Sequence, residues 1–189
     1  MIRCLILVVF LLTVSGPVPA TAQSPSPQQL VERARQLVPL IEDEYDFREI
    51  VALYSEASNR GHTIAKYELA ELLSVGPAEW ADYLTAARLY REAALDGHRP
   101  SRCICGWMHS AGMYGTDVDY ARAYALMTLD GRDVCEKMKD AIESVEIKMT
   151  DADKAKASTI ARKWLNGTLP QFSDRSSPVI QQAPGRPAD

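Results

Sequence analysis

Cysteine and histidine side chains that could bind a metal ion are concentrated in one short stretch of the chain. His98, Cys103, Cys105 and His109 are residue types that bind zinc. On a continuous helix, however, Cys103 faces away from the side that His98 and Cys105 share. Structural zinc sites normally use loops that aim four ligands at one point. We therefore expect neither a metal nor another cofactor here, and metal analysis of the purified protein would test this.

Two further groups could carry catalysis, and both have a structural interpretation. A reactive thiol needs exposure and a nearby base, whereas Cys105 occupies a position expected to be buried. The acidic run Glu42–Glu44 with Asp46 could act as acid and base or bind a hard cation. Acidic residues also stabilise the start of a helix, and an apolar helical pattern follows at once. The sequence therefore predicts a protein that is not an enzyme.

Residues 1–22 have the pattern of a secretory signal. Arg3 precedes an apolar run of eleven residues, Cys4–Val14, and Ala20-Thr21-Ala22 forms a cleavage site before Gln23. A membrane span needs about 20 apolar residues, so we expect cleavage and no membrane insertion afterwards. The pattern predicts a periplasmic or secreted protein.

The charge of the chain excludes some classes of partner. The net charge of −4 at pH 7 becomes more negative once Arg3 is removed with the signal. Nucleic acids and anionic membranes attract clustered Lys and Arg, and the chain has no such cluster. We expect no nucleic-acid partner.

The elements that must position these residues are repeated. The segment 87–97 returns as 121–131 with six of eleven residues identical, and a weaker copy occupies 51–61. A period of 34 to 36 residues is typical of helical repeat proteins. The sequence therefore predicts an all-α solenoid of about four helix hairpins.

Composition and capping patterns divide the chain further. We expect a leader and N-terminal helix over 23–45, a repeat domain over 46–168 and a disordered tail over 169–189. Capping boxes are predicted at 26–29 and 150–153, and Pro39 predicts that the first helix kinks or ends near Val38. Later helices are expected over 99–109, over 117–130 with Asp117 as N-cap, over 134–147, and from 151 to 166 with Leu165 on its apolar face. In the second helix of the central repeat, Tyr83 is expected on the apolar stripe.

The repeats resemble the Sel1-like family of tetratricopeptide-type repeats. Two successive units carry its small, aromatic and glycine positions, at Cys105-Gly106, Gly112, Asp117, Ala121, Tyr124 and Gly131, and at Ala86, Tyr90, Ala93, Ala94 and Gly97. Leu69-Ala70 and Thr128 depart from the pattern. The resemblance covers about residues 46 to 166 and implies a right-handed superhelix that acts as an interaction scaffold.

The repeat register also predicts a disulfide, the default for cysteines in an exported protein. A shift of 34 residues places Cys135 within one turn of Cys103, on adjacent parallel first helices. Cys103 and Cys105 point to different faces, and Cys105 takes the core position of Leu69. We expect a Cys103–Cys135 disulfide, with Cys105 buried and free.

Two classes of function follow. The first is an exported adaptor or regulator that binds a protein or peptide of unknown identity in its concave groove. The second is an accessory factor or enzyme acting on peptidoglycan or polysaccharide. Core packing is the alternative role of each tyrosine at a repeat position. The candidate groove contacts are Tyr67, Tyr90, Trp107, Tyr114 and Tyr124.

Overall fold

The computed structural model describes residues 24–167, except for the side chains of 132–134. This part contains eight α-helices and three short 3₁₀-helices, so the prediction of an all-α fold is confirmed. The α-helices are α1 (Pro27–Leu37), α2 (Glu44–Asn59), α3 (Thr63–Val75), α4 (Tyr83–Leu95), α5 (Arg99–Ala111), α6 (Tyr120–Thr128), α7 (Lys139–Lys148) and α8 (Asp151–Leu165). The 3₁₀-helices are η1 (Val38–Leu40), η2 (Ala78–Trp80) and η3 (Arg132–Met138).

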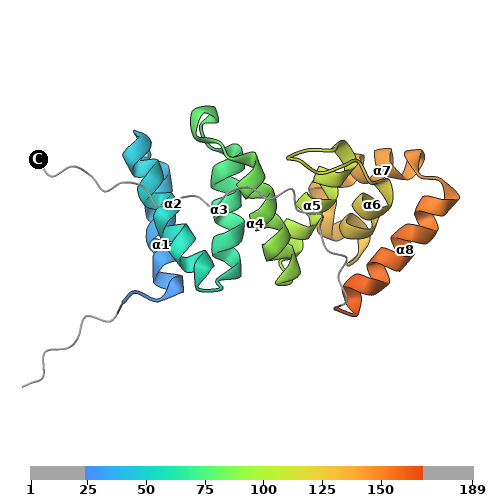
Figure 1. The fold of residues 1–189 in the computed structure, drawn as a ribbon, viewed down its shortest axis with the longest axis horizontal. Helices are drawn as coiled ribbons and strands as arrows, with labels where there is room; N and C mark the ends of the chain where they lie inside the picture. Colours follow the sequence, from blue (N-terminus) through green and yellow to red (C-terminus); the bar gives the residue numbers. More distant parts are fainter. Residues whose placement is uncertain (1–23, 168–189) are drawn as a thin grey trace, which may run out of the picture.

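The helices form a row in which α1–α2, α3–α4 and α5–α6 are antiparallel hairpins, and α7 and α8 both pack against α6 (Figure 1). The loop inside each of the first three hairpins lies at the upper edge of the view, and the turns between these hairpins lie at the lower edge. One hydrophobic cluster joins α1 to α5, and a second joins α5 to α8 through η3. Each hairpin thus buries its apolar face against its neighbours, as expected of a repeat protein.

Capping residues determine where the first and last helices begin. Ser26 accepts a hydrogen bond from the backbone of Gln29, whose side chain bonds back, and Thr150 forms the same box with Asp153. Both predicted capping boxes are confirmed. Helix α1 ends at Leu37, and Pro39 lies in η1, which confirms the predicted end near Val38.

The turns between hairpins repeat one backbone arrangement. Gly61 and Gly97 have φ angles of +83° and +91°, a conformation that favours glycine. The next residue is a histidine in each case. The Nδ1 atoms of His62 and His98 accept hydrogen bonds from the backbone N–H groups of Ala65 and Ser101, at 3.2 and 3.3 Å. These histidines therefore act as N-caps of α3 and α5, a more specific role than the loop position that the sequence indicates.

An ion pair also recurs at these turns. Lys66 on α3 lies 2.6 Å from Asp96, the residue before Gly97. Arg102 on α5 pairs in the same way with Asp130, the residue before Gly131. Arg102 is buried, and this desolvation lowers the pKa of its guanidinium. Each pair ties a first helix to the C-terminus of the second helix of the same hairpin.

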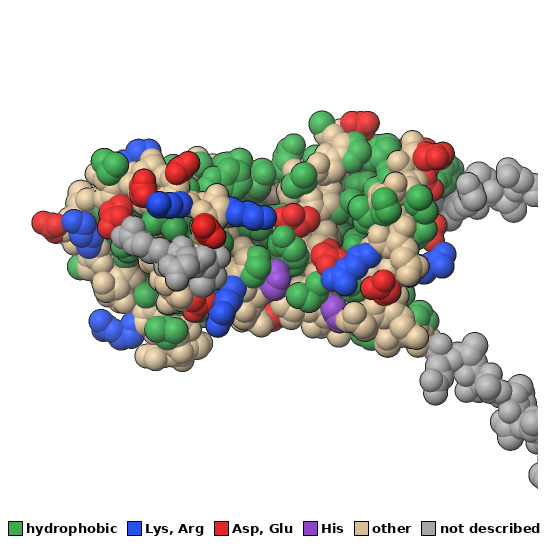
Figure 2. Space-filling view, turned by 180° about the vertical axis from the view of Figure 1, so that it is seen from behind, with side chains coloured by type: hydrophobic (Ala, Val, Ile, Leu, Met, Phe, Trp, Pro, Cys, Tyr) green, Lys and Arg blue, Asp and Glu red, His purple; other side chains and the backbone are tan. Residues whose placement is uncertain are grey.

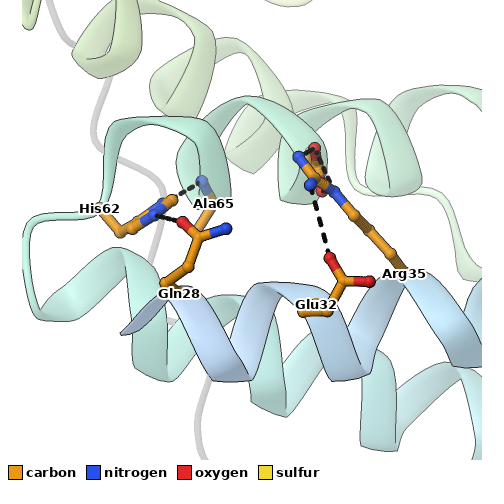
Figure 3. A network of polar contacts seen from close by, with 6 residues as sticks. Gln28, Glu32, Arg35, His62 and Ala65 are labelled. Carbon is orange, nitrogen blue, oxygen red and sulfur yellow. Dashed lines mark hydrogen bonds and ion pairs between the residues drawn. The ribbon is translucent and has the colours of Figure 1, made fainter. Parts of the chain in front are cut away.

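The side chains of α1 join this arrangement at the first turn (Figure 3). Because His62 Nδ1 accepts from Ala65, Nε2 carries the hydrogen and donates to Gln28 Oε1 at 3.0 Å. Two turns further along α1, Arg35 Nε donates to both carboxylate oxygens of Glu68 on α3, at 2.9 and 3.0 Å. These contacts fix α1 against α3 across the first turn between hairpins.

Helices α5 and α6 approach each other closely at Gly106. A Cβ atom at this residue would lie 2.5 Å from Met127 Cγ and 2.9 Å from the carbonyl oxygen of Ala123. Both distances are shorter than any normal contact, so the packing of these helices requires glycine. This agrees with the small position that the Sel1-like resemblance assigns to Gly106.

Two predicted helix boundaries are wrong. Helix α6 begins at Tyr120, and its N-cap is Asp119, which accepts from the Arg122 N–H at 2.9 Å; Asp117 precedes the helix. The helix expected over 134–147 is instead η3 followed by α7. Cys135 breaks any continuous helix here, since its φ and ψ of −107° and 37° are not helical.

Two predicted core positions are also wrong. Tyr83 and Leu165 are 44% and 68% exposed. Both lie at a helix end, Tyr83 on the first residue of α4 and Leu165 on the last residue of α8. Fewer neighbouring residues cover the apolar face at a helix end, so these side chains stay exposed. The predicted signal over 1–22 and tail over 169–189 lie outside the described residues.

Candidate functional site

One candidate site is a groove between α3, α5 and η3, with a cavity volume of about 860 Å³. Its walls come from the α3–α4 hairpin, the α5–α6 hairpin and η3. We call it the aromatic groove. Its lining residues are Tyr67, Glu71, Ser74, Val75, Tyr90, Pro100, Cys103, Ile104, Trp107, Tyr114, Cys135, Glu136, Lys137 and Met138.

The aromatic groove brings together most of the predicted contact residues. Tyr67, Tyr90, Trp107 and Tyr114 all line it. Tyr124 does not: it lines a separate cavity of about 330 Å³ between α6, α7 and α8. That any of these residues binds a partner stays a prediction.

Ring contacts hold the aromatic side chains in place. The Tyr67 ring lies 4.6 Å from the His98 ring and 6.1 Å from the Tyr90 ring, measured between centroids. Tyr114 stacks on Tyr83 at 5.0 Å with the two ring planes 1° apart. Tyr67 and Tyr114 are partly exposed, whereas Tyr90 is 2% exposed and forms the floor. The groove therefore presents aromatic surface that is already fixed.

Three polar side chains meet at this floor. Tyr90 Oη donates to Glu71 Oε1 at 2.7 Å and lies 2.9 Å from Ser74 Oγ. Burial raises the pKa of Tyr90 well above its usual value, with the neighbouring Glu71 carboxylate adding to the effect. Burial and then Glu71 also raise the pKa of Tyr67. Both hydroxyls therefore stay protonated at any physiological pH.

The predicted disulfide is confirmed and forms part of the groove wall. Cys103 and Cys135 are bonded, with their Cα atoms 5.7 Å apart, and Cys105 is free and fully buried. Burial raises the pKa of the Cys105 thiol to about 12, so it holds little thiolate at neutral pH. The expected geometry is only partly right, because Cys135 lies in η3 and not on a first helix parallel to α5.

The histidines and acidic residues that could bind a metal are placed apart. His98 caps α5, and the His109 Nδ1 atom lies 3.2 Å from the carbonyl oxygen of Asp117. Among the described side chains, no three His, Cys, Asp or Glu residues form a group that could hold a metal ion. Asp43 accepts from the backbone N–H groups of Tyr45 and Asp46 as the N-cap of α2, which confirms the structural interpretation of the acidic run.

The outer surface has one further apolar feature. Several exposed hydrophobic side chains lie in or beside the loops inside the hairpins: Leu40, Tyr45, Val75, Tyr83, Leu84 and Val118. Hydrophobic side chains are prominent along this edge at the top of Figure 2, while charges of both signs are interspersed below it. Within residues 24–167, no helix is both long and apolar enough to span a bilayer.

Sequence reasoning missed the polar floor of the groove. Tyr67, Glu71 and Ser74 recur at intervals of four and three residues, so they share one face of α3. That spacing was visible in the sequence. The spacing alone does not indicate a site, because Glu71 is held by Tyr90, which comes from the other helix of the hairpin.

Comparisons with known proteins support the fold. No family model matches the sequence, and no curated protein matches it. Among solved structures, the chain is similar to a protective antigen present in uropathogenic Escherichia coli strains, whose crystal structure displays an SLR, or Sel1-like repeat, fold. The TM-score is 0.63 at 20% sequence identity, over 84% of this chain and 35% of the antigen.

The chain thus matches about a third of the length of that antigen. At this identity the similarity concerns the arrangement of the helices. It agrees with the internal period of 34 to 36 residues and with the successive helix hairpins of the structure. The chain has a Sel1-like repeat fold.

Proposed function

We propose that the protein is an exported scaffold that binds a segment of another protein in the aromatic groove, as an adaptor or regulator in the cell envelope. One observation carries the proposal: two hairpins and η3 together form a cavity of about 860 Å³ lined by Tyr67, Trp107 and Tyr114. Tyrosine and tryptophan supply large contact areas at low entropic cost and dominate the energetics of protein interfaces.

Two further observations support this role. Proteins with helical repeats generally bind other proteins, and the chain shares the Sel1-like repeat fold. The Cys103–Cys135 disulfide is typical of proteins outside the reducing cytoplasm, in agreement with the signal predicted over residues 1–22.

Site-specific photocrosslinking in a cell-envelope extract tests the proposal. A photoreactive phenylalanine at position 107, in the groove, should give one protein adduct. The same group at position 95 serves as the matched control, because Leu95 is 43% exposed and does not line the groove. Equal adducts from both positions, or turnover of cell-wall material that one carboxylate substitution abolishes, would contradict the proposal.

A further inference from the structure

The described carboxylates that face neighbouring helices are mostly paired with cations. Glu68 pairs with Arg35, Asp96 with Lys66 and Asp130 with Arg102. These pairs lie between elements of the repeat and stabilise it. The carboxylate that lines the aromatic groove, Glu71, differs from them.

Glu71 is held as firmly but has no such counter-charge. Its Oε1 atom accepts from the buried hydroxyl of Tyr90 at 2.7 Å, and no described Lys or Arg side chain lies within 4 Å of its carboxylate. Glu71 lies one turn along α3 from Tyr67, and both line the cavity. A carboxylate can accept about four hydrogen bonds, so Glu71 keeps acceptor capacity that is open to the groove.

The rest of the lining does not neutralise this charge. Glu136 and Lys137, both on η3, are exposed and offset each other. The groove therefore has a net negative charge, carried by the Glu71 carboxylate beside the Tyr90 hydroxyl. Aromatic faces attract Lys and Arg, and the aliphatic stems of these side chains pack on apolar surface.

We propose that Glu71 is the anchor for a cationic side chain, and that the segment bound by the groove carries a Lys or Arg flanked by apolar residues. This assignment rests on the proposed function. The ammonium or guanidinium group donates to the free lone pairs of Glu71, its stem lies against Tyr67 and Trp107, and the flanking apolar residues cover Ile104 and Met138. Tyr90 acts as a positioning residue, because its hydroxyl fixes the carboxylate.

A random peptide library displayed on phage tests the assignment. Selection on the oxidised, signal-cleaved protein should enrich peptides with a Lys or Arg between apolar residues. Selection on the Glu71→Gln variant should lose the cation but keep the apolar residues. The matched control is Glu79→Gln, which removes the same charge from an exposed carboxylate outside the groove and should enrich the wild-type set.

A synthetic peptide from the enriched set then gives the magnitude. Glu71→Gln should raise its Kd about 10- to 150-fold, as expected for a hydrogen bond to a charged group. Replacing the peptide cation by Gln should have the same effect, and the two changes together should cost no more than either alone.

The outcomes separate this inference from the proposed function. Enriched peptides that are acidic or uncharged, or unchanged affinity in Glu71→Gln, would overturn the cation assignment while binding itself stands. The proposed function predicts that Trp107→Ala abolishes the binding of the enriched peptides. If no enriched peptide depends on Trp107 in this way, the proposed function and the cation assignment are both refuted. Unchanged thermal unfolding of each variant shows that a lost affinity is not a lost fold.

Discussion

Loss of the Cys103–Cys135 disulfide provides a quantitative test of how the C-terminal half is held together. The bond joins α5 to η3 across a sequence separation of 32 residues. Within this loop lies all of α6, and α8 packs against α6. The double variant Cys103→Ser/Cys135→Ser removes the bond without leaving an unpaired thiol beside Cys105.

The expected cost follows from the entropy of the unfolded chain. A crosslink over a loop of this length stabilises a protein by about 3.7 kcal/mol. For a folded region of this size that corresponds to a fall in Tm of about 10–15 °C. Because repeats contact only their neighbours, the loss should affect α5 to α8 more than α1 to α3.

Differential scanning calorimetry and hydrogen exchange measure the two parts of this prediction. The double variant should unfold at the lower Tm with or without reductant. Wild-type protein should reach the same Tm only after reduction. Amide exchange should become faster in η3, α6 and α7 and stay unchanged in α1.

The reasoning would be refuted if fully reduced wild-type protein kept the Tm of the oxidised form. It would also fail if exchange became equally fast in α1 and α7, since the bond would then act on the whole molecule. The matched control is Cys105→Ala, which leaves the disulfide intact and should keep the response to reductant.

Three further predictions concern individual contacts. Gly106→Ala should destabilise the protein by about 1–2 kcal/mol in denaturant unfolding, since the backbone clash with α6 outweighs the gain of about 1 kcal/mol in helix propensity. Burial lowers the pKa of His98 in the fold, so the stability that neutral His98 contributes is complete above about pH 6.5. It is lost as the pH falls, because the unfolded chain binds the proton at a higher pH than the folded protein. His98→Asn, which caps the helix without titrating, should therefore reduce the fall in Tm between pH 7.5 and 5. Arg102→Met should cost about 1–3 kcal/mol, because Asp130 loses its buried partner and keeps the exposed Arg99 at 3.3 Å, and the same loss in an Asp130→Asn background would contradict the ion pair.

Much of the fold could be predicted from local patterns. The repeated Tyr and Gly positions predicted the hairpins, and the residues 26–29 and 150–153 predicted two helix starts. These signals succeed because they act within one turn or one helix. The disulfide could also be predicted, because the repeat period relates residues that are distant in the chain.

The errors arise where one helix acts on another. Cys135 lies in a non-helical conformation within η3, bonded to a residue of the preceding hairpin, and the local pattern over 134–147 contains no sign of this. Asp117 and Asp119 are both good N-caps by type, and α6 begins at the second. Glu71 gained its significance only from Tyr90 and from the absence of a paired cation among the described side chains.

The turn before α3 and the turn before α5 are built from equivalent parts: a glycine with positive φ, a histidine cap, and a cation four residues after the histidine that forms an ion pair. Such a junction makes the hairpins interchangeable. A duplicated unit of 36 residues, inserted after Gly97, would find the same junction on both sides. The chain could therefore be lengthened by tandem duplication. Each added unit would extend the row of helices and would use the existing turn sequence to join its neighbours.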